Sequence, residues 1–572
     1  MSPVYDGFWL PRNLRRSLIT PETSWKVEYR RFGREAVEGE PETVGVRWPL
    51  LSASQWESLF HDLEVQREII PDDFISRLQE AISGLSFEMA GMDHSLIGAA
   101  LADISSYTGY SSEMIHFALN VMDLMPFDAL HKALTLHIPK DVDQRFVSLQ
   151  MIGGMGGWLR YIRNRKLRRS LLMYRDKVSG FLPYHSNYPN TVLGYAAGNV
   201  IGTGFLIALL AQVSALVDPG RASAHQNRIP AILIKNSREE PLFAPILFNV
   251  LEGLDPSLVS TIVLMIWDYE DDSLQDLIVS KADLILAAAS DYSINQIDQV
   301  ISRVNPKVRF HKHGHKVSFT TVGKSYLSRG VSGGDSFPEL FEMLTFLSAL
   351  DSIVWDQNGC ISSRIHFVEE GGQGHYSANE YGQMLTGKLR TLAKMLPRGG
   401  IPLGRIHDRF DFFNTQTVSD QIQLCSTYED DFIVVVDRRP WNSQQFRSMV
   451  NQCIERTIIV RPITSIQEVP SIYLSWIDEK NLQTMYVAID SEAHGSWSDE
   501  FTIFVEGVAK YGVTGVRSVG QGPYPQLAYS WDGYLPQSLS ITYPPGRFTT
   551  VEFEKNYAQV LKNYQTFASK FS

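Results

Sequence analysis

From about residue 190 onward, short and continuously apolar runs alternate with longer helical patterns. Strands are expected in "TVLGYAAGN", "RIPAILIKNS", "VSTIVLMIW" and "DLILAAAS", and helices in "FLIALLAQVSALV", "PLFAPILFNVLEGL" and "DDSLQDLIVSKA". Strands that are apolar throughout and alternate with helices are typical of a parallel sheet with helices on both faces. The pattern therefore predicts an α/β fold.

The later part of the chain continues in the same way. Extended structure is expected in "KVRFHKHGHKVSFTTV", a strongly apolar helix in "FPELFEMLTFLSALDSIV", and a strand in "RIHFVEE". More strands ("DDFIVVVDRRP", "RTIIVRPI", "QTMYVAI") and a helix ("DEFTIFVEGVAKYG") follow, whereas "YSWDGYLP" has the character of a connector. The first 150 residues are expected to be mixed and mostly helical, with a helical pattern that breaks at Pro71.

One uncharged segment, Thr191–Val217, is long enough for a membrane span. Glycines crowd its first half, and its continuous apolar part, Phe205–Val217, suits a buried helix better. No membrane span is expected.

Composition narrows the class further. The chain has 572 residues, 44% of them hydrophobic, and a net charge of −11, which gives no indication of nucleic-acid binding. Its three cysteines are too few for a disulfide framework or a zinc cluster, and its first residues lack the apolar run of a signal peptide. We therefore expect a cytoplasmic protein.

Three further features have simple structural interpretations. The basic run Arg160–Lys177 is expected to be a solvated helix face, although it could also face a phosphorylated cofactor or a carrier protein. The glycines of Gly153–Gly157 lack the spacing of a dinucleotide fingerprint. His311, His313 and His315 would share one face of a strand but splay too far apart for a tetrahedral ion, so no metal site is expected.

Cys360 is the candidate nucleophile. Gly359 precedes it and leaves room for a substrate, and Ser362 and Ser363 follow at what is expected to be a helix start. A helix N-terminus would lower the thiol pKa and favour the thiolate at neutral pH. Cys425 and Cys453 lack such surroundings and are expected to be structural.

Five segments, in this order, carry a resemblance to a known family: "AGNVIG", "KNSREEPLFAPIL", "HGHKVSF", "DQNGCIS" and "VAKYGVTGVRSVGQGPYPQLAYSWDGYLP". Over about residues 190–540, the chain resembles the acyl-CoA reductase family of the aldehyde dehydrogenase superfamily. The resemblance implies an aldehyde-dehydrogenase-like α/β fold, with a Rossmann-type dinucleotide domain and an α/β catalytic domain.

The resemblance also implies roles for individual residues. Cys360 would attack an acyl thioester, and Asn199 with the backbone N–H of Cys360 would hold the oxyanion. Lys235 would bind the adenosine ribose, with Ser237 and Arg238 beside it. An arginine there suits a ribose 2′-phosphate, so NADPH is favoured over NADH. Ser290 would lie at a helix start near the pyrophosphate.

One departure separates this chain from hydrolytic aldehyde dehydrogenases. The stretch Lys316–Lys324, where those enzymes carry a glutamate base, contains no acid. An acyl-enzyme that water cannot attack favours reduction of an acyl-CoA or acyl-carrier thioester. The resemblance implies a long fatty chain as the first expectation. Two alternatives stay open: NAD(P)-dependent aldehyde oxidation, which a catalytic acid near Cys360 would favour, and a cysteine acyltransferase without redox function.

The expected organisation has four parts: an N-terminal mostly helical region (1–150), a dinucleotide-binding domain (151–325), a catalytic domain with Cys360 (326–540) and a C-terminal segment (541–572). A homo-oligomer is expected, and an acyl-protein synthetase or carrier protein is a candidate partner. Nucleic acid is not.

Overall fold

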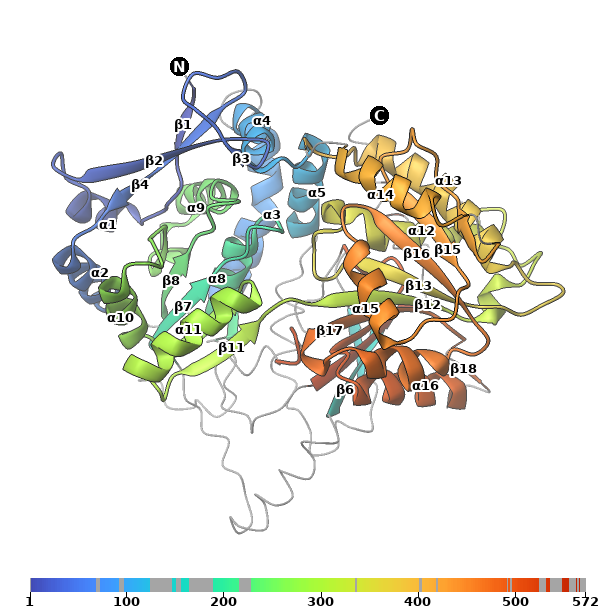
Figure 1. Cartoon of the computed structure of the whole chain (residues 1–572). Coiled ribbons are helices and arrows are strands. Elements are labelled where there is room, and N and C mark those ends of the chain that lie inside the picture. Colours follow the sequence, from blue (N-terminus) through green and yellow to red (C-terminus); the bar gives the residue numbers. More distant parts are fainter. Residues whose placement is uncertain are drawn as a thin grey trace, which may run out of the picture. The chain divides into compact units, whose positions relative to one another are not determined.

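The structure is a computed structural model of the chain. It describes residues 2–67, 73–91, 97–123, 147–150, 156–163, 189–214, 228–334, 337–400, 404–417, 420–490, 492–493, 496–523, 531–534 and 548–554, with residues 562 and 565. The chain divides into two compact units (Figure 1). Unit 1 comprises Met1–His137, Pro183–His315 and Leu535–Tyr543, and unit 2 comprises Ile138–Leu182, Lys316–Tyr534 and Pro544–Ser572. The domain boundaries expected at residues 150, 325 and 540 stay a prediction.

Unit 1 is built on a five-stranded parallel sheet in the order β11-β10-β7-β8-β9. Its strands are β7 (Thr191–Tyr195), β8 (Ala231–Lys235), β9 (Ile262–Met265), β10 (Leu284–Ala288) and β11 (Arg309–His313). Its helices are α8 (Thr203–Ser214), α9 (Phe243–Leu254), α10 (Asp272–Ser280) and α11 (Asp291–Val304). From β7 the chain adds β8 and β9 on one side of the sheet and then β10 and β11 on the other. The switch point between β7 and β10 is the arrangement of dinucleotide-binding folds.

The N-terminal part of unit 1 contains both strands and helices. Among its described residues, a small sheet of order β1-β4-β2-β3 accompanies five helices, which make up most of the regular structure. The strands are β1 (Val4–Asp6), β2 (Ser24–Arg31), β3 (Arg34–Glu35) and β4 (Val44–Leu50). The helices are α1 (Arg12–Leu18), α2 (Ala53–Val65), α3 (Phe74–Gly91), α4 (Ile97–Thr108) and α5 (Ser112–Asp123). Trp9 pairs with Leu264 of β9 through two backbone hydrogen bonds of 2.9 Å, so this region joins the edge of the parallel sheet.

Unit 2 contains a ten-stranded sheet in the order β14-β15-β16-β13-β12-β17-β20-β21-β6-β5. In Figure 1 the teal strand β6 lies among the red strands, because its partner β21 comes from the end of the chain. The strands are β5 (Val147–Gln150), β6 (Gly156–Arg163), β12 (Val317–Val322), β13 (Ser363–Glu369), β14 (Ile422–Leu424), β15 (Ile433–Asp437), β16 (Thr457–Ile463), β17 (Leu482–Ala488), β20 (Gly515–Ser518) and β21 (Phe548–Glu554), with the separate pair β18 (Glu492–Ala493) and β19 (Ser496–Trp497).

The helices of unit 2 are α12 (Leu340–Ile353), α13 (Ala378–Met395), α14 (Gly404–Asn414), α15 (Ser443–Gln452) and α16 (Asp499–Lys510). Short helical turns are η3 (Pro256–Leu258) in unit 1 and η4 (Lys324–Leu327), η5 (Val354–Gln357), η6 (Val469–Tyr473), η7 (Leu474–Trp476) and η8 (Glu479–Asn481) in unit 2. The central strands β12, β13, β15, β16 and β17 run parallel and are buried along nearly their whole length, as their apolar sequences predict.

The uncharged segment Thr191–Val217 contains a strand and a short helix. Thr191–Tyr195 forms β7 and Thr203–Ser214 forms α8, while residues 215–217 lie outside the described residues. None of the helices that the structure describes is long and apolar enough to cross a membrane.

Candidate active site

Cys360 lies in a turn between η5 and β13, in unit 2. The expected helix start at Ser362 and Ser363 is wrong, because Ser363 is the first residue of β13. The sulfur therefore gains nothing from a helix N-terminus. Cys360 keeps partial solvent exposure, and the protein packed around its sulfur raises the thiol pKa to about 11. Cys360 is therefore a thiol at neutral pH, contrary to the predicted thiolate.

The backbone before Cys360 has an unusual conformation. Trp355, Asp356 and Gln357 have φ values of 60°, 50° and 62°, in the left-handed region that costs a non-glycine residue roughly 1–2 kcal/mol. Three such residues in succession persist only where surrounding contacts enforce them. This turn leads directly into Asn358, Gly359 and Cys360.

The side chains of this turn are tied to the start of β16. Gln357 donates to the backbone oxygens of Ser363 (3.0 Å) and Thr457 (2.9 Å), and accepts from the N–H of Thr457 at 2.8 Å. Asp356 accepts from Nε of Arg456 at 2.8 Å and forms an ion pair with it at 2.7 Å. Both charged side chains are almost completely buried. The contacts explain how the strained turn is held in place.

Arg456 has further partners. Its guanidinium donates to the Leu396 carbonyl at 2.7 Å and to Asp431 at 3.1 Å. Arg456 and the preceding Glu455 are themselves in the left-handed region, with φ of 63° and 51°. Two strained loops, one before β13 and one before β16, are thus fastened to each other by one buried ion pair.

The sulfur contacts a polar side chain that the sequence did not single out. Nε2 of Gln483, in β17, donates to Sγ of Cys360 at 3.3 Å, and the same nitrogen donates to Oδ1 of Asp532 at 2.7 Å. Asp532 comes from the segment interpreted as a connector, and it is buried with a φ of 50°. The Asp-Gly pair at 532–533 signalled a turn, and nothing in the sequence marked Gln483.

Two hydroxyl groups fix the backbone at Cys360 and Ile361. Oγ of Ser318, in β12, donates to the Cys360 carbonyl at 2.7 Å, and the Tyr486 hydroxyl, in β17, donates to the Ile361 carbonyl at 2.7 Å. The turn is therefore bound from β12, β16 and β17, which are central strands of the sheet.

The predicted cofactor residues, together with the predicted oxyanion residue Asn199, lie at the carboxyl edge of the unit 1 sheet. Lys235 is the last residue of β8, Ser237 and Arg238 follow it, Asn199 follows β7, and Ser290 caps α11 after β10. Carboxyl ends of parallel strands are where open α/β sheets bind ligands. A Cβ on Gly198 would come within 2.4 Å of Ser237 Oγ, so only glycine allows these two loops to approach. The arrangement fits a dinucleotide.

Lys235 and Arg238 differ in their surroundings. Burial, with a smaller contribution from Arg238, lowers the pKa of Lys235 to about 8, and its Nζ lies 5.4 Å from the Trp267 ring centre. Arg238 forms an ion pair with Asp268, and its guanidinium lies 5.4 Å from the Trp48 ring centre. A 2′-phosphate at Arg238 would have to share it with Asp268.

Ser290 and Asn199 both form hydrogen bonds with other residues of unit 1. Ser290 Oγ accepts from the N–H of Ser293 at 3.1 Å, as an ordinary helix cap does, and the next residue is acidic. The carboxylate of Asp291 accepts from the N–H of His315 at 2.8 Å. The Asn199 carbonyl accepts from the Tyr110 hydroxyl at 2.6 Å. Since Asn199 belongs to unit 1 and Cys360 to unit 2, their pairing stays a prediction.

The expectation that three histidines share one strand face is wrong. His311 and His313 lie in β11 and are buried, but the strand ends at His313 and His315 is exposed. A Cβ on the intervening Gly314 would come within 2.3 Å of Asp291 Oδ1. Among the residues that the structure describes, no group of three or more His, Cys, Asp or Glu could hold a metal ion. Most of the basic run (164–177) and residues 153–155 of the glycine run lie outside the described residues.

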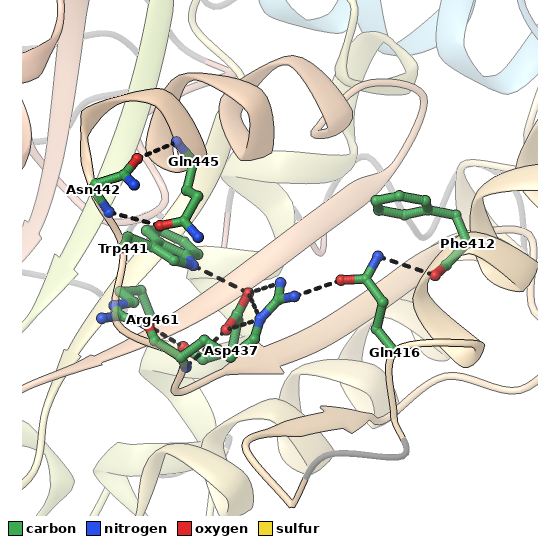
Figure 2. A network of polar contacts seen from close by, with 8 residues as sticks. Phe412, Gln416, Asp437, Trp441, Asn442, Gln445 and Arg461 are labelled. Carbon is green, nitrogen blue, oxygen red and sulfur yellow. Dashed lines mark hydrogen bonds and ion pairs between the residues drawn. The ribbon is translucent and has the colours of Figure 1, made fainter.

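A second polar cluster in unit 2 lies where β15 ends (Figure 2). Asp437, the last residue of β15, is buried and pairs with Arg439, and it also accepts from Trp441 Nε1 at 3.2 Å. Arg461 donates to the Asp437 carbonyl at 2.8 Å, and Arg439 donates to Gln416 at 2.6 Å. Asp437 and Arg439 pair with each other, and the hydrogen bonds of Arg461 and Gln416 tie this pair to the neighbouring segments.

Solved structures with the same architecture define the class of fold. Aldehyde dehydrogenase 21 from Physcomitrella patens, in complex with succinate, aligns with a TM-score of 0.53 and 9% identity, covering 97% of this chain and 99% of that one. An aldehyde dehydrogenase from Mycobacterium tuberculosis complexed with NAD+ aligns with a TM-score of 0.51 and 12% identity, covering 90% of each chain. The fold is therefore that of the aldehyde dehydrogenases.

The sequence places the chain more narrowly. Residues 228–538, more than half of the chain, match the acyl-CoA reductase (LuxC) family. The chain belongs to this family and is an oxidoreductase of the acyl-CoA reductase type. Cys360, Gln483 and Asp532 all lie within the matched residues, whereas Asn199 precedes them. The comparison with curated proteins found no match.

Proposed function

We propose that this enzyme reduces a long-chain acyl thioester to an aldehyde with NADPH, through an acyl group bound to Cys360. The observation that carries the proposal is the position of that thiol. It is partly exposed, its turn is fixed from three central strands, and its sulfur accepts a hydrogen bond from Gln483. A nucleophile must be held in this way to attack a carbonyl reproducibly.

The reaction has two stages at the sulfur. Cys360 loses its proton and attacks the thioester carbonyl, the bond to the leaving thiol breaks, and that thiol takes up a proton. The Asn199 amide and the Cys360 N–H stabilise the oxyanion, each by about 3–4 kcal/mol. When bound, NADPH would supply the hydride that reduces the acyl carbon. The resulting oxyanion on Cys360 then collapses to release the aldehyde, and the Cys360 thiolate takes up a proton from solvent to restore the thiol.

The proposed cofactor contacts follow the carboxyl edge of unit 1. Lys235 binds the ribose, Ser237 and Arg238 the 2′-phosphate, and Ser290 lies near the pyrophosphate. The donor is an acyl-CoA or acyl-carrier thioester, or an acyl group passed on by a synthetase. We propose that the enzyme works in a reducing compartment such as the cytoplasm, because the nucleophile must stay a thiol. We also propose that it forms a homo-oligomer.

Aldehyde oxidation with hydrolysis is the second candidate, since a carboxylate does lie near Cys360. Asp532 accepts from Gln483 and is buried, so it is engaged with an amide rather than with water. A base for hydrolysis would have to activate water. The geometry therefore favours reduction.

The test combines activity with a matched cysteine control. With palmitoyl-CoA and NADPH, wild type should oxidise NADPH and form the aldehyde, C360A should do neither, and C425A should retain the activity because Cys425 lies apart from the turn. Aldehyde formation by C360A, or none by wild type with any acyl-CoA from short to long chain, would overturn the proposal. Faster NADP+ reduction with aldehyde than NADPH oxidation with acyl-CoA would favour the second candidate.

A further inference from the structure

The amide of Gln483 uses both of its N–H groups. One is donated to Cys360 Sγ at 3.3 Å and the other to Asp532 Oδ1 at 2.7 Å. Within the described part of the chain, the Oε1 atom of this amide is buried and accepts no hydrogen bond. Only the NH2 end is engaged, and it bridges the sulfur and the carboxylate.

The carboxylate decides which end of the amide faces the sulfur. If the amide turned over, its oxygen would lie against an oxygen of Asp532 at hydrogen-bond distance. An ionised carboxylate only accepts hydrogen bonds, so this orientation would leave two acceptors facing each other. Asp532 therefore selects the orientation in which Gln483 donates to Cys360.

Charged groups around the thiol act in opposite directions. Burial has the largest effect on the pKa of Cys360 and the charge of Asp532 the second largest, and both raise it. The Gln483 hydrogen bond and Lys316 lower this pKa. Lys316 precedes β12, and Arg364, in β13, also interacts with the Cys360 thiolate. The two cations oppose Asp532, and burial together with Asp532 outweighs them.

We propose that Gln483 and Asp532 are positioning residues of the Cys360 nucleophile. Gln483 donates to the sulfur and favours its ionised form. Asp532 fixes the amide that does so, and by its charge keeps the sulfur a thiol in the free enzyme. The role of these residues in catalysis rests on the proposed function. Their effect on the ionisation of the Cys360 thiol does not, and it can be measured without substrate or cofactor.

The test is the rate of Cys360 alkylation by iodoacetamide between pH 7 and 9.5, without acyl-CoA or NADPH, followed site by site by mass spectrometry. At a pH below the thiol pKa, the alkylation rate is proportional to the thiolate fraction. That fraction changes tenfold for each unit by which a substitution shifts the pKa. Gln483→Met retains the length but not the donor, and should slow alkylation by about tenfold. Asp532→Asn removes the charge, and should accelerate it by about tenfold, because the carboxylate outweighs the amide.

The control is internal. Cys425 is also partly exposed and lies away from the turn, so its alkylation should be the same in all three proteins. A loosened fold would accelerate both cysteines in both variants. If one variant does not fold, the other still gives a signed shift. Equal rates in folded variants, or shifts of the same sign at Cys360, would overturn the assignment.

A kinetic readout separates positioning from substrate binding. In Q483M, the rate of Cys360 acylation at saturating acyl-CoA should fall while KM changes less than about threefold. The two proposals fail separately. Opposite alkylation shifts without any acylation by thioesters would refute the reductase function alone, and acylation with unchanged alkylation profiles would refute only the positioning roles.

Discussion

The buried ion pair between Asp356 and Arg456 gives the sharpest prediction about the turn that precedes Cys360. Asp356→Ala leaves a buried guanidinium that retains the Leu396 carbonyl and Asp431 but has lost the carboxylate that contacts it twice. Removing one partner of a buried pair costs about 3–5 kcal/mol. A domain is stable by only ~5–15 kcal/mol, so the loss should be plain in a urea unfolding curve.

The chain offers a matched control for this loss. Asp431 contacts the same guanidinium at 3.1 Å, but its side chain is 27% exposed. Because water replaces part of that contact, Asp431→Ala should cost about 1 kcal/mol or less. The double variant D356A/R456M should be more stable than the sum of its single variants predicts, since neither side chain of the buried pair is left without the other.

Backbone strain supplies a second, independent comparison at the same position. With φ at 50°, Asp356 occupies a conformation that glycine adopts freely and alanine does not. Asp356→Gly should therefore be about 1 kcal/mol less destabilising than Asp356→Ala. The assay is urea unfolding followed by tryptophan fluorescence, with Trp355 next to the site. Equal losses in D356A and D431A would refute the reasoning.

Two other predictions concern the cofactor and pH. Arg238→Ala should raise KM for NADPH at least tenfold more than KM for NADH, since one charged contact is worth about 1.5–3 kcal/mol; equal effects would remove the NADPH assignment. The comparison variant is Lys26→Ala, which also loses an ion pair with Asp268 but leaves Arg238 in place. Burial lowers the pKa of His366 to about 3, so the unfolded chain binds this proton first as pH falls from about 6.5. Between about pH 6.5 and pH 3, His366 should therefore lower the free energy of unfolding of the wild type by ~1.4 kcal/mol for each unit of decreasing pH. The urea midpoint of H366N should depend less steeply on pH, and identical slopes for the two proteins would contradict this.

The sequence was sufficient for the elements whose signal is local. Continuous apolar strands such as β8 and β15 were predicted because burial on both faces removes any alternation. The helix of α12 and the strand β13 on either side of Cys360 followed from the same reasoning. The lysine at the end of β8 also lies where the pattern placed it.

The parts that the sequence could not predict depend on distant contacts. Gln483 and Asp532 are far from Cys360 along the chain, and only the folded sheet brings them to the sulfur. The left-handed turn before Cys360 is formed by Trp355, Asp356 and Gln357, which no propensity assigns to that conformation. The predicted helix start failed because two serines fit a strand entry as well as a cap.

The central claim is that Cys360 becomes acylated, and intact-protein and peptide mass spectrometry after incubation with palmitoyl-CoA tests it most directly. The account predicts one palmitoyl group, located on Cys360, that persists in water and disappears with release of the aldehyde when NADPH is added. An acyl group on Cys425 instead, or wild type that stays unmodified while it still oxidises NADPH, would contradict the account.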